Sequence, residues 1–208
     1  MADTGFQLTP ETLPAIREEY WPEEMCQLIP EGPAPDVGVI MGSDSDMRVM
    51  AHALKLLTEL DVTHEKMVVS AHRTPNWMAL YGFIAVRRGL KVIVAGAGGS
   101  AHLPGDVASL TTLPVLGVAI EEKPDGLNPA LGSMAAMPAE GGPLAVTGRE
   151  KAGAINASLV AARILSLANP ELAVRVEQRM KDKSHEVMFE KHFTVMNMSD
   201  EEIAALAA

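Results

Sequence analysis

Short apolar runs alternate with helical patterns from Val37 onward. The run at residues 37–41 (VGVIM) precedes a stretch in which Val49, Leu57 and Leu60 recur at helical spacing. The same order of strand and helix then repeats, with strands predicted at the following places: residues 64–70, 92–98, 115–120 and near 143–147. This alternation predicts a parallel sheet with right-handed crossovers and helices on both faces.

The pattern divides the chain into three parts. Residues 1–36 form an N-terminal arm that ends in a proline-rich, stiff linker. Residues 37–168 form the α/β domain, and its last element is a long Ala-rich helix from about residue 151 to 167. Residues 169–208 form a helical tail that is typical of packing or oligomer-contact elements.

The arm and the tail each carry helix-start signals. In the arm, Thr9–Glu11 places a helix N-cap before a proline, and Tyr20, Trp21 and Ile29 are apolar enough to pack on this domain or on a neighbouring subunit. In the tail, a charged helix is predicted from Pro170 to about residue 192. A capping box at residues 199–202 predicts a last short helix.

Composition limits the kinds of partner. The 208 residues are 48% hydrophobic and only 4% aromatic, which favours one layered α/β core. A formal net charge of -10, without a dense Lys/Arg cluster, argues against nucleic acid as a partner. A small phosphorylated ligand remains compatible with this charge, because a helix N-terminus and one or two cations can bind a single phosphate.

Cysteine usage and the N-terminus indicate a soluble protein of the cytoplasm. The single cysteine, Cys26, cannot form an internal disulfide, and the sequence has no Cys/His spacing suited to zinc. The N-terminal residues are charged and contain no long apolar run, so we expect neither a signal peptide nor a membrane-spanning helix.

Three loops that follow predicted strands carry the candidate chemistry. They are GSDSD at residues 42–46, SAHRTP at 70–75 and GAGGSAHLPG at 96–105. In parallel α/β sheets, ligands bind beyond the carboxyl ends of the strands, where such loops lead into helices. We therefore expect these three loops to form one site.

The first loop has two interpretations. Gly42 permits close approach of the backbone, the hydroxyls of Ser43 and Ser45 can hold a phosphate, and Asp46 can accept hydrogen bonds from ribose. Ser and Asp are also the residues preferred at helix N-caps, so the loop is equally typical of a capping cluster.

The second loop offers a proton carrier beside a cation. His72 can transfer protons near neutral pH, Arg73 suits phosphate recognition, and Thr74 with Pro75 starts the next helix. A lone histidine is often a bystander, and that alternative stays open at this point.

The third loop is rich in glycine, which lets main chain approach a planar ligand. Its Gly96, Gly98 and Gly99 do not match the spacing of a dinucleotide fingerprint, and the loop follows the third strand rather than the first. The loop is not a Walker phosphate loop either. His102 within it is a further candidate for function.

With these loops in order, the chain resembles the bacterial-type N5-carboxyaminoimidazole ribonucleotide mutases, the class I group of the aminoimidazole ribonucleotide carboxylase family. Similarity extends over about residues 37–168 and includes PVLGV at 114–118 and the dipeptide at Asn156. The resemblance implies a flavodoxin-like three-layer α/β/α sandwich. It also implies a homo-octamer, an aminoimidazole ribonucleotide as substrate, and neither metal nor organic cofactor.

The resemblance also implies roles for individual residues, with His72 as the acid/base. It places the substrate phosphate and ribose near side chains of the first two loops: Ser43, Ser45, Asp46, Ser70 and Arg73. It brings residues of the third loop against the base and the migrating carboxylate: Gly98, Ala101, His102 and Leu103. The implied reaction is decarboxylation, retention of the CO2, and recarboxylation at ring carbon 4, where His72 removes the proton.

Two departures from the family pattern stand out. Met47 replaces the tryptophan that usually follows the first loop, and the segment at residues 119–147 is largely rewritten. In that segment Glu121 and Glu122 occupy positions where the family has small or neutral residues. Two carboxylates there would weaken the binding of an anionic substrate unless they point to solvent or reach a subunit partner.

Three functions are compatible with these residues. The intact loops favour the mutase, and Arg73 argues against the sister carboxylases that use free CO2, which resemble SAHK at this loop. The rewritten segment keeps open such a carboxylase or an enzyme with an altered ligand. A binding or assembly module without catalysis is the third, although such a module has no use for the proton shuttle that His72 provides.

Overall fold

The computed structural model describes residues 25, 28–30, 32–121 and 129–207. The helix predicted at Thr9–Glu11 and the side chains of Tyr20 and Trp21 lie outside these residues. Ile29 of the arm is half-buried and packs against the core of its own domain. The chain divides into two compact units between Leu165 and Ser166, and each is described by itself.

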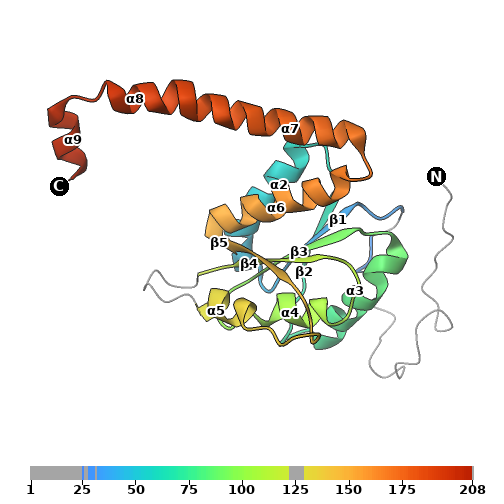
Figure 1. Ribbon diagram of the computed structural model, residues 1–208. Helices are drawn as coiled ribbons and strands as arrows, with labels where there is room; N and C mark the ends of the chain where they lie inside the picture. Colours follow the sequence, from blue (N-terminus) through green and yellow to red (C-terminus); the bar gives the residue numbers. More distant parts are fainter. Residues whose placement is uncertain (1–24, 26–27, 31, 122–128, 208) are drawn as a thin grey trace. The chain divides into compact units, whose positions relative to one another are not determined.

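The first unit is built on a parallel sheet of five strands (Figure 1). The strands are β1 (Val37–Met41), β2 (His64–Val68), β3 (Val92–Ala97), β4 (Val115–Ala119) and β5 (Ala145–Arg149). They lie in the order β2-β1-β3-β4-β5, and every neighbouring pair is parallel. This is the flavodoxin-like order, in which the winding reverses between β1 and β3 and leaves a crevice at their carboxyl ends. The predicted strands and fold are confirmed.

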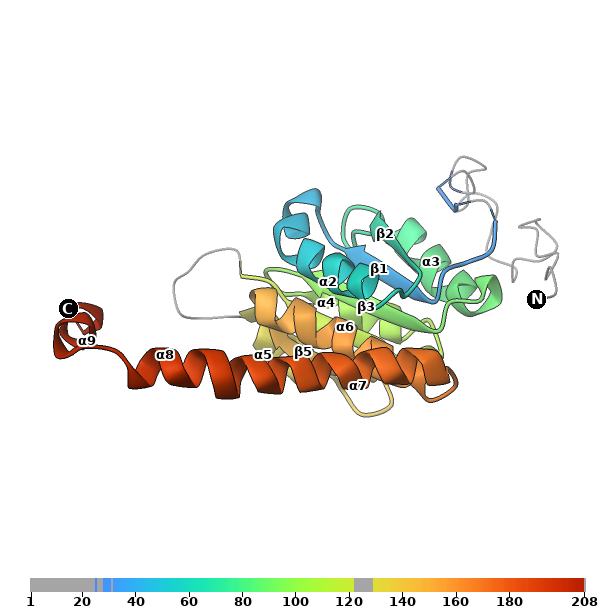
Figure 2. The ribbon, with the colours of Figure 1, turned by 90° about the horizontal axis from the view of Figure 1, so that it is seen from above.

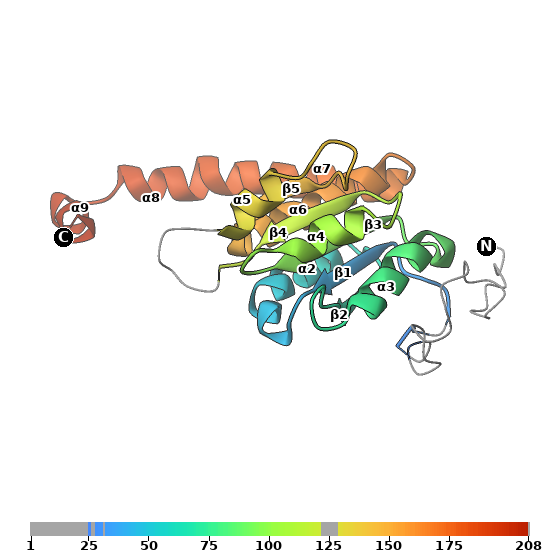
Figure 3. The same cartoon turned by 90° about the horizontal axis from the view of Figure 1, so that it is seen from below.

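Helices cover both faces of the sheet. One face carries α2 (Met47–Glu59) and α6 (Glu150–Ser166), and the other carries α3 (Pro75–Arg88), α4 (His102–Ala108) and α5 (Pro129–Ala135), as Figures 2 and 3 show. A short 3-10 turn, Asp44–Asp46, precedes α2. The three-layer sandwich is thus present, and α5 is an addition that the sequence pattern did not predict.

Burial follows the position of each strand in the sheet. Every residue of β1, β3 and β4 is buried, whereas the edge strands β2 and β5 are partly exposed. Central strands of a parallel sheet are covered on both faces, which is why their sequences are continuous apolar runs. Between the helices of one face, the Ser158 hydroxyl donates to the Ala53 carbonyl oxygen at 3.1 Å. The rigid centre of the sheet supports the loops that follow β1 and β3.

The second unit is helical. It contains α7 (Pro170–His185), a π-helical turn (Glu186–Lys191), α8 (His192–Met196) and α9 (Asp200–Leu206). The helix predicted to end near residue 192 therefore continues to Met196. The capping box is confirmed, because the Glu202 carboxylate accepts from the Ser199 N–H at 2.8 Å and the Ser199 hydroxyl accepts from the Glu202 N–H. None of the helices in the described part of the chain is long and apolar enough to cross a membrane.

Candidate active site

A cavity of about 540 Å³ opens beyond the carboxyl ends of the central strands. All of the residues that the sequence analysis assigned to the site line it: Ser43, Ser45, Asp46, Ser70, His72, Arg73, Gly98, Ala101, His102 and Leu103. Six further residues complete the lining: Gly42, Arg48, Ala71, Ala97, Ile120 and Glu121. The three predicted loops therefore form one site, while the chemical role of each residue stays a prediction.

The first loop is a helix cap. Asp46 Oδ2 accepts from the Ser43 N–H at 2.9 Å, and Ser43 Oγ accepts from the Ser45 N–H at 3.4 Å. The capping interpretation is therefore confirmed for both residues. Asp46 is 8% exposed, whereas Ser43 is half-buried and Ser45 is exposed, with their hydroxyls 3.0 Å apart. The cap holds two hydroxyl groups at the rim of the cavity.

The second loop is tied to the first by Arg73. Arg73 Nε donates to Ser70 Oγ at 3.2 Å, and Arg73 Nη2 donates to the Gly42 carbonyl oxygen at 2.7 Å. Ser70 is itself buried, and its N–H donates to Thr74 Oγ1 at 3.0 Å. These bonds orient the guanidinium group while leaving it exposed at the junction of the two loops.

The third loop has an unusual backbone at its end. Ala101 has φ 48° and ψ 46°, a left-handed conformation that costs a residue with a side chain about 1–2 kcal/mol. Gly99, two residues earlier, also has a positive φ, and a glycine adopts this conformation without the steric cost that Ala101 bears. The turn allows α4 to begin at His102 and directs the imidazole of that residue into the cavity.

The two histidines of the site form a pair. His72 Nε2 lies 2.7 Å from His102 Nδ1, and the rings are nearly perpendicular, at 87°. One nitrogen must donate and the other accept, so both rings cannot be cationic while this bond persists. Both side chains are exposed to the cavity. The pair can therefore hold and pass on one proton, which argues against His72 as a bystander.

One wall of the cavity carries two charged side chains, Arg48 and Glu121, of which the sequence pattern indicated only Glu121. Arg48 lies one residue beyond the start of α2 and was missed, because nothing near it in sequence marks its partners. Glu121, expected to repel an anion, instead pairs with Arg149 at 2.7 Å between Oε1 and Nη1. Glu122, the other departure, lies outside the described residues. The charge of Glu121 is thus paired within its own chain, an arrangement that the sequence pattern did not predict.

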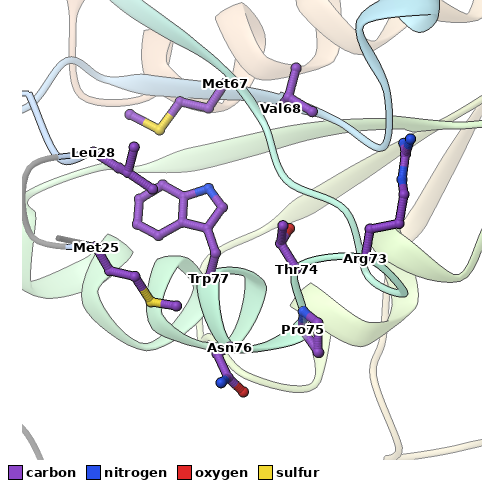
Figure 4. Close-up of a pocket in the computed structure, with 9 residues that line it drawn as sticks. All are labelled: Met25, Leu28, Met67, Val68, Arg73, Thr74, Pro75, Asn76 and Trp77. Atoms are coloured by element: carbon purple, nitrogen blue, oxygen red, sulfur yellow. The ribbon is translucent and has the colours of Figure 1, made fainter. Parts of the chain in front are cut away.

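A second cavity of about 550 Å³ lies at the start of α3 (Figure 4). Its walls are mainly apolar, with Trp77 facing Met67 and Leu28. Among the described residues that line it, Arg73 alone is ionisable, and its side chain points away from Trp77. Its described lining thus offers no candidate acid or base, whereas the first cavity contains two histidines.

The sequence of this chain matches a known protein family. The profile of the AIR carboxylase family matches residues 36–186. The chain belongs to this family. The matched region contains all five strands and every residue that lines the first cavity.

Named members of the AIR carboxylase family are close in sequence. The N5-carboxyaminoimidazole ribonucleotide mutase of Bacillus subtilis is 50% identical over 154 residues, which are 74% of this chain and 94% of that protein. The mutase of Mycobacterium tuberculosis is 53% identical over 150 residues, 72% of this chain and 84% of that protein. A crystal structure of Treponema denticola PurE has the same fold, with a TM-score of 0.63 at 24% identity, covering 73% of this chain and 93% of that one.

The described residues show no metal centre in this member of the family. Within residues 25, 28–30, 32–121 and 129–207, no group of three or more His, Cys, Asp or Glu side chains is placed to hold a metal ion.

Proposed function

We propose that this chain is the mutase of purine synthesis that converts N5-carboxyaminoimidazole ribonucleotide into 4-carboxy-5-aminoimidazole ribonucleotide. The observation that carries the proposal is the 50% identity to a mutase of this name over 94% of its length. The cavity with its histidine pair supplies the chemistry that the reaction needs.

The reaction is an isomerisation, so no electrons enter or leave. In the first half, the N–C bond of the carbamate breaks, CO2 is released into the cavity, and the amine nitrogen gains a proton. In the second half, ring carbon 4 forms a C–C bond to the CO2 and loses its proton. His72 donates the first proton and accepts the second, so the imidazole ends as it began. His102 accepts or donates across the 2.7 Å bond and keeps the His72 ring oriented.

Different loops bind different parts of the substrate. Ser43, Ser45 and Asp46 hold ribose and phosphate oxygens together with Ser70 and Arg73. Gly98, Ala101 and Leu103 present backbone and apolar surface to the planar base, and His102 adds its ring to that side. Confinement of the CO2 beside ring carbon 4 raises its effective concentration, which is the main contribution required of the protein.

Replacing Arg73 with Ala should raise KM about twentyfold, because a charge-assisted contact to the phosphate is lost. The value of kcat should fall much less, since Arg73 does not move a proton. Steady-state kinetics measures both. Arg87→Ala, at the far end of α3, is the matched control and should change KM by less than about twofold. An unchanged KM in Arg73→Ala would remove Arg73 from phosphate binding.

The proposal is tested by an ultraviolet assay of the purified protein with two substrates. One reaction contains N5-carboxyaminoimidazole ribonucleotide, and the other contains aminoimidazole ribonucleotide plus bicarbonate. Turnover of the carbamate alone supports the mutase. Turnover only with bicarbonate would make the chain a carboxylase, as the family description AIR carboxylase also allows. Absence of both activities would refute the proposed function.

We further propose that the protein acts in the cytoplasm as a homo-octamer, without a cofactor, and that residues 1–36 and 169–208 are an arm and a tail that precede and follow the catalytic domain in the sequence. Several exposed apolar side chains of the first unit support subunit contacts: Val68, Phe83 and Val86. Light scattering coupled to size-exclusion chromatography measures the assembly directly.

A further inference from the structure

Four charged side chains meet at one wall of the active-site cavity. Arg48 Nη1 donates to Glu150 Oε2 at 2.7 Å, and Arg48 Nη2 donates to Glu150 Oε1 at 3.2 Å. Next to this bidentate pair, Arg149 Nη1 contacts Glu121 Oε1 at 2.7 Å. The four residues come from α2, the loop that follows β4, the last residue of β5 and the first residue of α6. We call them the rim network.

The rim network holds the backbone of Glu121 on both sides. The Glu121 N–H donates to Glu150 Oε1 at 2.7 Å, and the Glu121 carbonyl oxygen accepts from Arg48 Nη2 at 2.5 Å. Burial alone would raise the pKa of Glu150, but the bonds from Arg48 and from the Glu121 N–H outweigh it and lower that pKa below its ordinary value. Glu150 therefore remains an anion at neutral pH and keeps all three bonds.

The backbone is strained where the network is anchored. Glu150 has φ 51°, a left-handed conformation that is unfavourable for a residue with a side chain. The carboxylate stands at the first residue of the 17-residue helix α6, where a negative charge is favourable. Glu150 thus occupies a strained position, and from this position its carboxylate reaches both Arg48 and the Glu121 N–H.

Stability alone does not account for these pairs. The side chains of Arg149 and Glu121 are 59% and 23% exposed, and exposed ion pairs add little to the free energy of unfolding. Position is the more informative feature, because Arg48 and Glu121 line the cavity while Arg149 and Glu150 do not. Without Arg149, the Glu121 carboxylate would present its full charge beside a ligand that carries a phosphate and a carboxylate.

We propose that Arg149 is a positioning residue that acts through Glu121, by neutralising and holding its carboxylate so that this wall of the cavity accepts an anionic ribonucleotide. The inference rests on the proposed function for the identity of the ligand. It adds a determinant of substrate affinity that lies outside the three loops, and it acts through Glu121, which belongs to the segment where this chain departs from the family pattern.

The test compares four proteins in steady-state kinetics at low salt: wild type, Arg149→Ala, Glu121→Gln and the double variant. Arg149→Ala should raise KM about fivefold, because the unpaired Glu121 carboxylate then repels the anionic ligand across partly screening solvent, with little change in kcat. Glu121→Gln should lower KM below that of wild type. The double variant should return KM to within about twofold of wild type, and about 0.5 M salt should reduce all the differences.

Rescue separates this mechanism from the alternatives. Arg149→Lys keeps the positive charge beside Glu121 and should leave KM near the wild-type value. If Arg149 instead contacted the ligand directly, or if its loss disturbed the fold, Glu121→Gln would not restore the KM of Arg149→Ala. An unchanged KM in Arg149→Ala, or a double variant no better than Arg149→Ala, would overturn the proposal. Calorimetric titration of the same proteins with aminoimidazole ribonucleotide should give Kd values in the same order. That order is measurable even if the wild type shows no turnover, so failure of the proposed function is distinguishable from failure of this one.

Discussion

Replacing His72 with Asn should lower kcat by about a thousandfold, because proton transfer by a positioned imidazole contributes about two to four orders of magnitude. Binding should survive. The Asn amide is polar and smaller than the imidazole, and its atoms overlay the Nδ1 side of that ring, so the variant keeps a polar group in the cavity while it loses the 2.7 Å contact between His72 Nε2 and His102 Nδ1. What the amide lacks is a proton that it can release and recover near neutral pH.

Two measurements separate catalysis from binding in this variant. Turnover of N5-carboxyaminoimidazole ribonucleotide should fall to near background, and titration with aminoimidazole ribonucleotide should give a Kd within about threefold of wild type. His52→Asn is the matched control, since His52 lies on α2 and does not line the cavity. Normal turnover in His72→Asn would remove His72 from the mechanism, and a loss of binding equal to the loss of turnover would make it a binding residue.

Replacing Glu65 with Ala should lower the free energy of unfolding by about 3–5 kcal/mol, the usual cost of breaking a buried ion pair from one side. Glu65 Oε2 accepts from Arg88 Nη2 at 2.6 Å, and Oε1 accepts from Arg88 Nη1 and from the Tyr81 hydroxyl, both at 2.8 Å. The Glu65 and Arg88 side chains are 7% and 6% exposed. Alanine would leave a buried cation and a buried hydroxyl without their acceptor.

The hydroxyl of Tyr81 also depends on the Glu65 carboxylate, which accepts its hydrogen bond. Burial, and then the Glu65 carboxylate, raise the pKa of Tyr81 well above its ordinary value, so the phenol remains a donor at neutral pH. Tyr81→Phe removes one neutral donor while Arg88 stays paired, and it should cost only about 1 kcal/mol. Urea denaturation of the first unit, followed by tryptophan fluorescence, measures the loss of stability in both variants.

An exposed carboxylate provides the control for Glu65. Glu59, in the same unit, pairs with Lys55 at 3.8 Å, and their side chains are 41% and 75% exposed. Glu59→Ala should therefore change the free energy of unfolding by less than about 1 kcal/mol. Equal effects at Glu65 and Glu59 would show that the buried group contributes no more than a surface pair.

Close packing around Tyr81 also explains a glycine whose role the sequence pattern did not reveal. A Cβ added at Gly38 would lie 2.1 Å from the Tyr81 hydroxyl oxygen. Gly38 is the second residue of β1, and the apolar pattern predicts a strand there whatever the size of the side chain at this position. Only the packing of α3 on the sheet makes the absence of a side chain necessary at this position.

Local pattern alone was sufficient for the five strands, for the helices that flank the site and for the three loops. Apolar runs that are buried on both faces, such as β1 and β3, are distinctive because a central parallel strand cannot expose polar side chains. Parallel strands place their carboxyl ends at one edge, so the loops at residues 42–46, 70–75 and 96–105 had to meet. The helix α5 escaped prediction because Pro129–Ala135 carries only a short apolar pattern beside a rewritten segment.

The sequence by itself therefore determined the order of strands and helices, the edge at which the site lies, and the residue types that reach it. Tertiary structure alone decided which of those residues touch. The bond between His72 and His102, the bridge from Arg73 to Gly42 and the rim network all join residues far apart in the chain. Such contacts depend on the twist and register of the sheet and on side-chain direction, which no local pattern of apolar and polar residues encodes.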